Sequence, residues 1–199
     1  MKKYITEFIG AFFLVLTIAL SGNPIAIGFV LTALVYMGGY ISGGYYNPAV
    51  TLAVLLIKKI SPDDATKYMI SQVAGGFVAA IAYSMIVGGN FVPSIGSNAN
   101  TISAILVETL FTFLLASVVL HVGVTDKTKG NDYFGLAIGV TILAAATAGG
   151  PISGGVFNPA VAVGPMIFDI NHLNVNNLFI YLLGPFLGGY LASVVYKLK

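Results

Sequence analysis

A ten-residue phrase that occurs twice constrains the fold of this chain more than any other feature. Residues 41–50 read Ile-Ser-Gly-Gly-Tyr-Tyr-Asn-Pro-Ala-Val, and residues 152–161 read Ile-Ser-Gly-Gly-Val-Phe-Asn-Pro-Ala-Val. In each copy the asparagine is a favourable helix N-cap, and the proline suits the first helical position, where no backbone N–H is needed. Each copy therefore predicts a helix that begins at its proline, Pro48 or Pro159.

The apolar run after each proline is too short to cross a bilayer. From Pro48 the sequence stays apolar to Ile57, and from Pro159 it stays apolar to about Phe168. A helix of about 10 residues is about 15 Å long, which is half the thickness of the hydrocarbon core. The two phrases thus predict two half-helices that enter a membrane without crossing it.

The composition is that of an integral membrane protein. Of the 199 residues, 57% are hydrophobic and 8% are charged, and the mean hydropathy is +0.93. Soluble domains carry about 25% charged residues. The chain has no cysteine, which excludes disulfides, thiolate metal sites and thiolate nucleophiles. We expect no metal, no cofactor and no nucleic-acid partner.

Six further apolar stretches are long enough to span a bilayer. They cover about residues 4–20, 25–41, 65–87, 101–124, 133–148 and 178–196. We interpret the first as a retained span rather than a cleaved secretory signal, because Glu7 lies within it. Six crossings place all nine lysines on one side, and lysine-rich loops face the cytoplasm. We therefore expect a multi-pass protein of the cell membrane (plasma or inner membrane) with both termini in the cytoplasm.

The chain reads as a single domain, residues 1–199, built from two related halves, 1–92 and 98–199. Glu7 in the first half has a counterpart in Glu108 of the second half. Each half has three spans, so the second half is inserted upside down. Inverted repeats with broken helices build sites near the midplane of a membrane. The expected fold class is all-α integral membrane, with six transmembrane helices and two re-entrant half-helices in an inverted 3+3 repeat.

These features together resemble the aquaporin (major intrinsic protein) family, and the resemblance covers nearly the whole chain. It rests on the two Asn-Pro-Ala boxes, on the early glutamates of spans one and four, and on Gly75-Gly76 and Gly188-Gly189 of spans three and six. The resemblance implies six tilted helices and two half-helices around a narrow pore. It also implies a homotetramer in membrane lipid, with one pore per subunit.

The resemblance assigns roles to the residues of both phrases. The implied pore-centre residues, whose asparagine amides would contact the solute, are Asn47, Pro48, Ala49, Asn158, Pro159 and Ala160. The residues whose backbone carbonyls would line the pore are Gly43, Gly44, Tyr45, Tyr46, Gly154, Val156 and Phe157. Glu7 and Glu108 would hold the re-entrant loops by accepting hydrogen bonds from their backbone N–H groups.

The sequence departs from the family pattern at the outer constriction of the pore. The family usually has an arginine directly after the second Asn-Pro-Ala, and this chain has Val161. The other three constriction positions fall at Ile27, Ala146 and Gly155. None of the four side chains donates a hydrogen bond, and only Ile27 is bulky. The resemblance therefore implies a selectivity filter that is wide and apolar.

We expect a passive channel for water and/or small uncharged solutes such as glycerol, urea or ammonia. The alternative is a structural or poorly conducting membrane protein of the same fold, because bulky Tyr45, Tyr46 and Phe157 could occlude the pore. An ion channel on this frame is a weaker alternative. Enzymatic activity is not expected, since the two histidines, His121 and His172, fall at opposite membrane faces.

Overall fold

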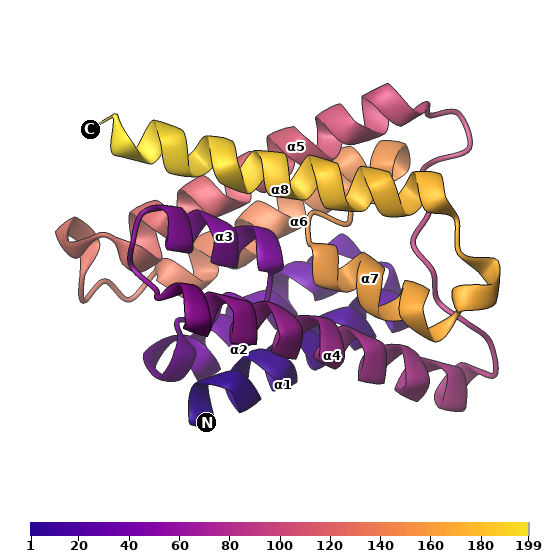
Figure 1. Cartoon of the computed structure of the whole chain (residues 1–199), viewed down its shortest axis with the longest axis horizontal. Coiled ribbons are helices and arrows are strands. Elements are labelled where there is room, and N and C mark those ends of the chain that lie inside the picture. Colours follow the sequence, from indigo (N-terminus) through magenta and orange to yellow (C-terminus); the bar gives the residue numbers. More distant parts are fainter. Residues whose placement is uncertain (199) are drawn as a thin grey trace.

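The computed structural model describes residues 1–198, and this part of the chain is helical without any strand (Figure 1). The helices are α1 (Lys2–Ser21), α2 (Pro24–Ser42), α3 (Pro48–Leu56), α4 (Pro62–Val87), α5 (Thr101–Val118), α6 (Phe134–Ser153), α7 (Pro159–Phe168) and α8 (Val175–Lys197). A π-helical turn, Val119–Val124, continues α5, and short 3-10 turns cover Asp126–Thr128 and Ile170–His172.

Within residues 1–198, six helices are long and apolar enough to cross a membrane, and the chain is therefore a multi-pass membrane protein. They are α1, α2, α4, α5 with its π-helical turn, α6 and α8. The short helices α3 and α7 begin at Pro48 and Pro159, as the sequence predicts. Figure 1 shows α3 and α7 between α4 and α8, and each of the two short helices contacts both of these spans.

Polar side chains cap the starts of α2 and α4. The side chain of Asn23 accepts a hydrogen bond from the backbone N–H of Ile25 at the start of α2. Ser61 accepts one from Asp64 at the start of α4. The predicted end of the fifth span, at residue 148, is wrong, because α6 runs through Pro151 to Ser153. An interior proline is tolerated in membrane helices where neighbouring groups satisfy the freed backbone.

Glycines set the distance between the packed helices. A Cβ at Gly139 of α6 would collide with Thr32 and with the Gly28 carbonyl of α2. Two glycines four residues apart, here Gly135 and Gly139, allow such a close approach between membrane helices. Gly75 of α4 lies in the same way against the α1 backbone, and Gly188 of α8 lies against the α5 backbone. The first glycine of each Gly-Gly pair thus packs its span against the first span of the same half.

Figure 1 shows both labelled termini, the start of α4 and the connection between α5 and α6 at one end of the bundle, and the lysines among residues 1–198 belong to these segments and to the connection between α3 and α4. At this end Lys3 pairs with Asp64 (2.8 Å) and Lys59 pairs with Asp126 (3.1 Å). Lys199, which the sequence places on the same side, lies outside the described residues. We call this end the lysine end and the opposite one, which carries the loop between α4 and α5, the outer end.

The replacement Gly139→Ala is expected to destabilise the protein by about 1–3 kcal/mol, because the methyl group overpacks the contact between α2 and α6. The matched control is Gly123→Ala, where the added Cβ would have Ile138 as its neighbour at 4.0 Å. Thermal unfolding of both variants in detergent measures the difference. An equal unfolding temperature for the two variants would contradict this account of the packing.

Candidate functional site

The N-termini of the two half-helices meet inside the bundle, and two asparagines link them. Asn47 caps α3 with its Oδ1 atom, and its Nδ2 donates to the carbonyl of Phe157 at 2.9 Å. Asn158 caps α7 in the same way, and its Nδ2 donates to the carbonyl of Tyr46 at 2.9 Å. Each asparagine therefore holds its own helix start and the loop of the other half. Because an amide nitrogen has two hydrogens, each keeps one donor for a further partner.

A buried carboxylate fixes the first loop. Glu7 of α1 has no exposed surface. Its two oxygens accept from the backbone N–H groups of Tyr45 (3.1 Å) and Tyr46 (2.7 Å). They also accept from the Ser42 hydroxyl (2.6 Å) and from Gln72 Nε2 (2.7 Å). The loop N–H groups have no helical partner, and each would cost several kcal/mol if left unpaired in a membrane.

Glu108 of α5 fixes the second loop in the same manner. It is also fully buried, and it accepts from the backbone N–H groups of Val156 (3.0 Å) and Phe157 (2.5 Å) and from the Ser153 hydroxyl (2.7 Å). Within residues 1–198, no amide side chain is hydrogen-bonded to it. In the first loop Gln72 reaches both Glu7 and Thr51. The second loop thus depends on fewer hydrogen bonds than the first.

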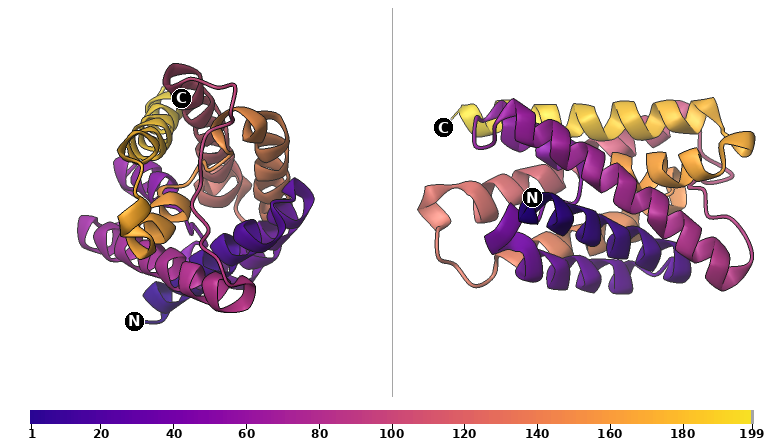
Figure 2. Two further views of the ribbon diagram at one scale, coloured as in Figure 1. Left: turned by 90° about the vertical axis from the view of Figure 1, so that its right-hand side faces the viewer. Right: turned by 60° about the horizontal axis from the view of Figure 1, so that its bottom comes forward.

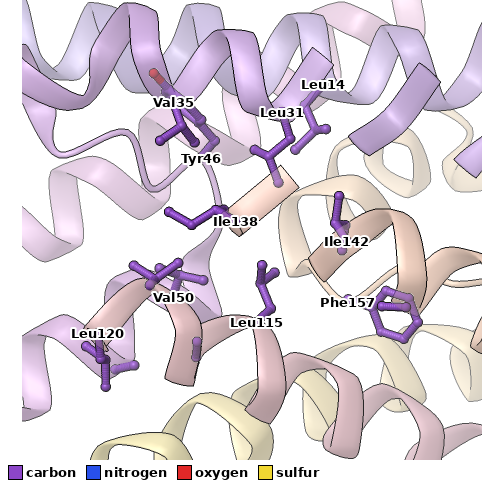
Figure 3. Packing of buried hydrophobic residues seen from close by; sticks show 14 of the residues in the cluster. Leu14, Leu31, Val35, Tyr46, Val50, Leu115, Leu120, Ile138, Ile142 and Phe157 are labelled. Atoms are coloured by element: carbon purple, nitrogen blue, oxygen red, sulfur yellow. The ribbon is translucent and has the colours of Figure 1, made fainter. Parts of the chain in front are cut away.

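The residue before each asparagine has a left-handed backbone. Tyr46 has φ 51° and Phe157 has φ 50°, values that non-glycine residues rarely adopt. The Tyr46 ring packs against Gly10 and Gly38, and its hydroxyl donates to the carbonyl of Leu34 at 2.8 Å. Both rings are fully buried in the apolar core (Figure 3). Neither ring is among the residues that line the cavities described next, and occlusion of a pore by these rings stays a prediction.

Three cavities follow one another along the bundle. A central cavity of about 20 Å³ is lined by residues that include Asn47 and Asn158. It shares Val161 with an outer cavity of about 540 Å³. It shares Val119 and Ile138 with an inner cavity of about 560 Å³ at the lysine end. The narrow section of this path is therefore the central cavity, which the two asparagines help to line.

The four predicted filter residues come together where the outer cavity meets the central one. Ile27, Ala146, Gly155 and Val161 all line the outer cavity, and all but Ala146 also line the central cavity. Their sources are α2, α6, the second loop and α7. The surface that they share is apolar, apart from backbone groups.

The predicted carbonyl-lining residues divide into two sets. Those that line a cavity are Gly43, Gly44, Tyr45, Gly154 and Val156. Tyr46 and Phe157 are not among the residues that line the three cavities, but their carbonyls accept from the amides of Asn158 and Asn47, which do line the central one. A lining role for these two carbonyls stays a prediction. Tyr45 is the bulky loop residue that remains in contact with the central cavity.

Sequence reasoning missed several residues that line the cavities. The loop between α4 and α5 crosses the outer end (Figure 2, left) and contributes Ser94 to the outer cavity. Gly96 ties this loop to the carbonyl of Ile152 at 2.9 Å. The uncharged, Gly- and Ser-containing composition of the loop was the available signal. Leu31 and Leu115 point toward one another in Figure 3 and line the central cavity. The sequence could not identify them as lining residues, because an apolar residue that lines a cavity has the same sequence pattern as one in the core.

The titratable groups of the described residues do not gather into a metal site. Residues 1–198 contain no group of three His, Cys, Asp or Glu side chains that could hold a metal. His121, near the lysine end, contacts the carbonyl of Ser117 at 2.7 Å through Nδ1. His172, at the outer end, contacts Asp169 at 2.7 Å through Nδ1. The hydrogen bond raises the pKa of His172 above its ordinary 6.5 and lowers the pKa of Asp169 below 3.8.

Comparisons with known proteins cover nearly the whole chain. The family model described as "Major intrinsic protein" matches residues 1–196. The chain is 37% identical to "Glycerol uptake facilitator protein-like 6" of Lactiplantibacillus plantarum, over 97% of this chain and 95% of that protein. It is 32% identical to "Aquaporin AqpM" of Methanothermobacter thermautotrophicus, over 98% and 96%. The X-ray structure of the aquaglyceroporin from Plasmodium falciparum matches with a TM-score of 0.83 at 20% identity, over 98% of this chain and 95% of that one.

The replacement Glu108→Gln is expected to destabilise the protein by about 1–3 kcal/mol, since the amide cannot accept from all the loop donors. The control is Thr109→Val on the same helix, because the buried Thr109 hydroxyl has no hydrogen-bond partner. This control should leave the stability unchanged or raise it. Thermal unfolding in detergent compares the two, and an equal loss in both would contradict the anchoring role of Glu108.

The contact between His172 and Asp169 is expected to add stability only in a limited pH range. The contribution of His172 is lost as the pH rises through its raised pKa, and that of Asp169 is lost as the pH falls through its lowered pKa. His172→Gln should therefore lower the unfolding temperature at about pH 5 and have little effect at about pH 9. A loss of equal size at both pH values would show that the ion pair is not the cause.

Proposed function

The chain belongs to the major intrinsic protein family, and we propose that it is a passive channel for water and small uncharged solutes of the glycerol, urea and ammonia class. The observation that carries this proposal is the path of three cavities. The path narrows at Asn47 and Asn158 and opens outward through an apolar junction. The names of the relatives, a glycerol uptake facilitator and an aquaporin, agree with the solute class.

A solute in the narrow section would exchange its water hydrogen bonds for protein ones. The free hydrogens of the two asparagine amides are the donors, and carbonyls of loop residues such as Gly44 and Val156 are the acceptors. Leu31 and Ile142 supply an apolar surface to the same cavity. A molecule with hydroxyl groups along one edge and carbon along the other matches such a lining, and glycerol is of this kind.

The prolines and alanines of the two boxes position the asparagines in this proposal. Pro48 and Pro159 begin the half-helices without an unpaired N–H. A Cβ at Gly189 would collide with the carbonyl of Ala49, and a Cβ at Gly76 would collide with that of Ala160. The second glycine of each pair thus lets a span of one half approach the half-helix of the other half: α8 approaches α3, and α4 approaches α7.

The apolar junction is the place where the outer and central cavities share Ile27, Gly155 and Val161. It favours neutral solutes that can pass with few hydrogen bonds. Ile27 and Val161 contact the solute through carbon, so an ion would lose hydration there without compensation, at a cost of several kcal/mol. Further in, each half-helix N-terminus carries about half a positive charge. Two of them repel a cation at about 4 Å by roughly 4 kcal/mol at an effective dielectric constant of about 20. This argument favours a neutral-solute channel over an ion channel.

The remaining features follow from the same proposal. The chain is one domain, residues 1–199, of inverted halves 1–92 and 98–199, and the matched glycine pairs and carboxylate anchors support this division. The lysine end and both termini face the cytoplasm of a cell membrane. The family relationship supports a homotetramer with one path per subunit. A passive channel requires no catalytic residue, so we do not propose an enzymatic activity.

Glycerol re-entry into shrunken proteoliposomes, followed by stopped-flow light scattering, tests the proposal. Vesicles with the protein should swell faster in a glycerol gradient than empty vesicles. The matched control is Ala146→Phe, which places a ring in the outer cavity from an ordinary helical position. Swelling at the rate of the empty vesicles would rule out the glycerol class, and swelling unaffected by Ala146→Phe would place the path elsewhere.

The replacement Val161→Arg is expected to reduce glycerol flux about tenfold or more, equivalent to about 1.4 kcal/mol of added barrier. Water flux should fall less, because water is smaller and can hydrogen-bond to the guanidinium group. The control Val161→Ala removes volume without adding a donor and should leave both fluxes high. Equal reduction of water and glycerol flux by Val161→Arg would contradict a filter at this junction.

A further inference from the structure

A further cavity at the lysine end lies beside the path of the proposed channel. Its volume is about 400 Å³, and it is lined by Leu56, Ile57, Lys58, Thr125, Lys127, Tyr196 and Lys197. The residues come from the end of α3, from the turn after α5 and from the end of α8. We call it the basic cavity. It exists only when these three segments, distant in sequence, are folded together.

The basic cavity has an excess of positive charge. Among residues 1–198, the carboxylate nearest to it in sequence is Asp126, which pairs with Lys59 at 3.1 Å. Lys58, Lys127 and Lys197 form no ion pair within the described part of the chain. The carboxyl ends of α3 and α8 each contribute about half a negative charge. Three lysines outweigh these two partial charges, so an anion would be attracted to the cavity.

The backbone at Lys58 is a second and independent indication. Lys58 has φ 62°, and the N–H of Lys59 donates to the carbonyl of Val54 at 3.1 Å. This is the helix C-cap arrangement in which glycine is usual, because a Cβ is strained there. The chain thus has a lysine where glycine would be the more stable residue. Strained positions of this kind concentrate at functional sites.

The span that ends at the cavity carries a stripe of exposed apolar side chains. Leu183, Leu187, Leu191 and Val195 follow one another at intervals of four along α8, and Val195 is 46% exposed. This stripe runs along the membrane span and ends at Val195, which precedes the cavity residues Tyr196 and Lys197 in the sequence. A phosphate ion in solution has no apolar group that could contact this stripe. A lipid would place an acyl chain along it and its headgroup at the lysines.

We propose that the basic cavity binds the phosphate of an anionic phospholipid from the leaflet at the lysine end. Basic pockets between membrane helices on the cytoplasmic side recognise such headgroups. Thr125 lines both the basic cavity and the inner cavity of the channel path. A bound headgroup would therefore contact the turn that forms part of the inner mouth.

Titration of the purified full chain in neutral detergent tests this proposal, with the number of bound lipids counted by native mass spectrometry. The probes are short-chain phosphatidylglycerol, phosphatidylcholine with the same acyl chains, and inorganic phosphate. The cavity variant carries Lys58→Gln, Lys127→Gln and Lys197→Gln. The matched control carries Lys2→Gln, Lys67→Gln and Lys129→Gln, which remove the same charge from exposed lysines outside the cavity.

Phosphatidylglycerol should bind the native chain more tightly than phosphatidylcholine. Its affinity should fall by about tenfold or more in the cavity variant and by less than about twofold in the control. Equal losses in both variants would show that the charge of the whole face is responsible and would overturn the proposal. Displacement of the lipid by inorganic phosphate at the same concentration would make this a site for soluble anions and would also overturn it.

The single replacement Lys58→Gly tests the same site if the triple variant does not fold. It removes one charge and also relieves the left-handed strain, so the thermal stability without lipid should stay the same or rise. The affinity for phosphatidylglycerol should still fall severalfold. Unchanged affinity in Lys58→Gly would show that Lys58 does not contact the headgroup, and the proposed site would be wrong.

Discussion

The structure depends on two buried carboxylates that satisfy backbone N–H groups inside a membrane. A half-helix that starts at the centre of a bilayer needs a loop to reach that point, and the N–H groups of this loop have neither helix nor water to bind. Glu7 and Glu108 accept those hydrogen bonds, and the loops can then place their asparagines face to face. An ionisable side chain within an apolar span is costly, and these hydrogen bonds offset that cost.

The two halves share the same structural contacts but line the central cavity with different residues. Both have the same anchor, cap and glycine contacts, so the N-termini of α3 and α7 meet in matching geometry. The first half adds Gln72 as a further donor to its carboxylate and places Tyr45 at the central cavity. The second half places Gly155 and Val156 there. The two halves therefore give the path similar backbone features but different side chains, and the apolar filter residues lie where the central cavity meets the outer one.

Much of this arrangement could be predicted from the sequence, and the failures have identifiable causes. The repeated phrase predicted both half-helix starts, because Asn followed by Pro is a strong local signal that tertiary contacts do not override. The end of α6 was predicted too early, because a proline such as Pro151 normally ends a helix, and the sequence does not show which groups in space satisfy the freed backbone. The direction of the Tyr46 and Phe157 rings depends on a left-handed backbone held by distant groups, which no local pattern reveals.

The temperature dependence of osmotic water flux in proteoliposomes tests most directly whether the two anchored loops form a continuous path. Carbonyl acceptors and the amides of Asn47 and Asn158 replace the hydrogen bonds that water loses on entry. The barrier should therefore be low, and the rate should rise with temperature much less steeply than in empty vesicles. A temperature dependence as steep as that of the bare bilayer would mean that water crosses through lipid, and the proposed path would be wrong.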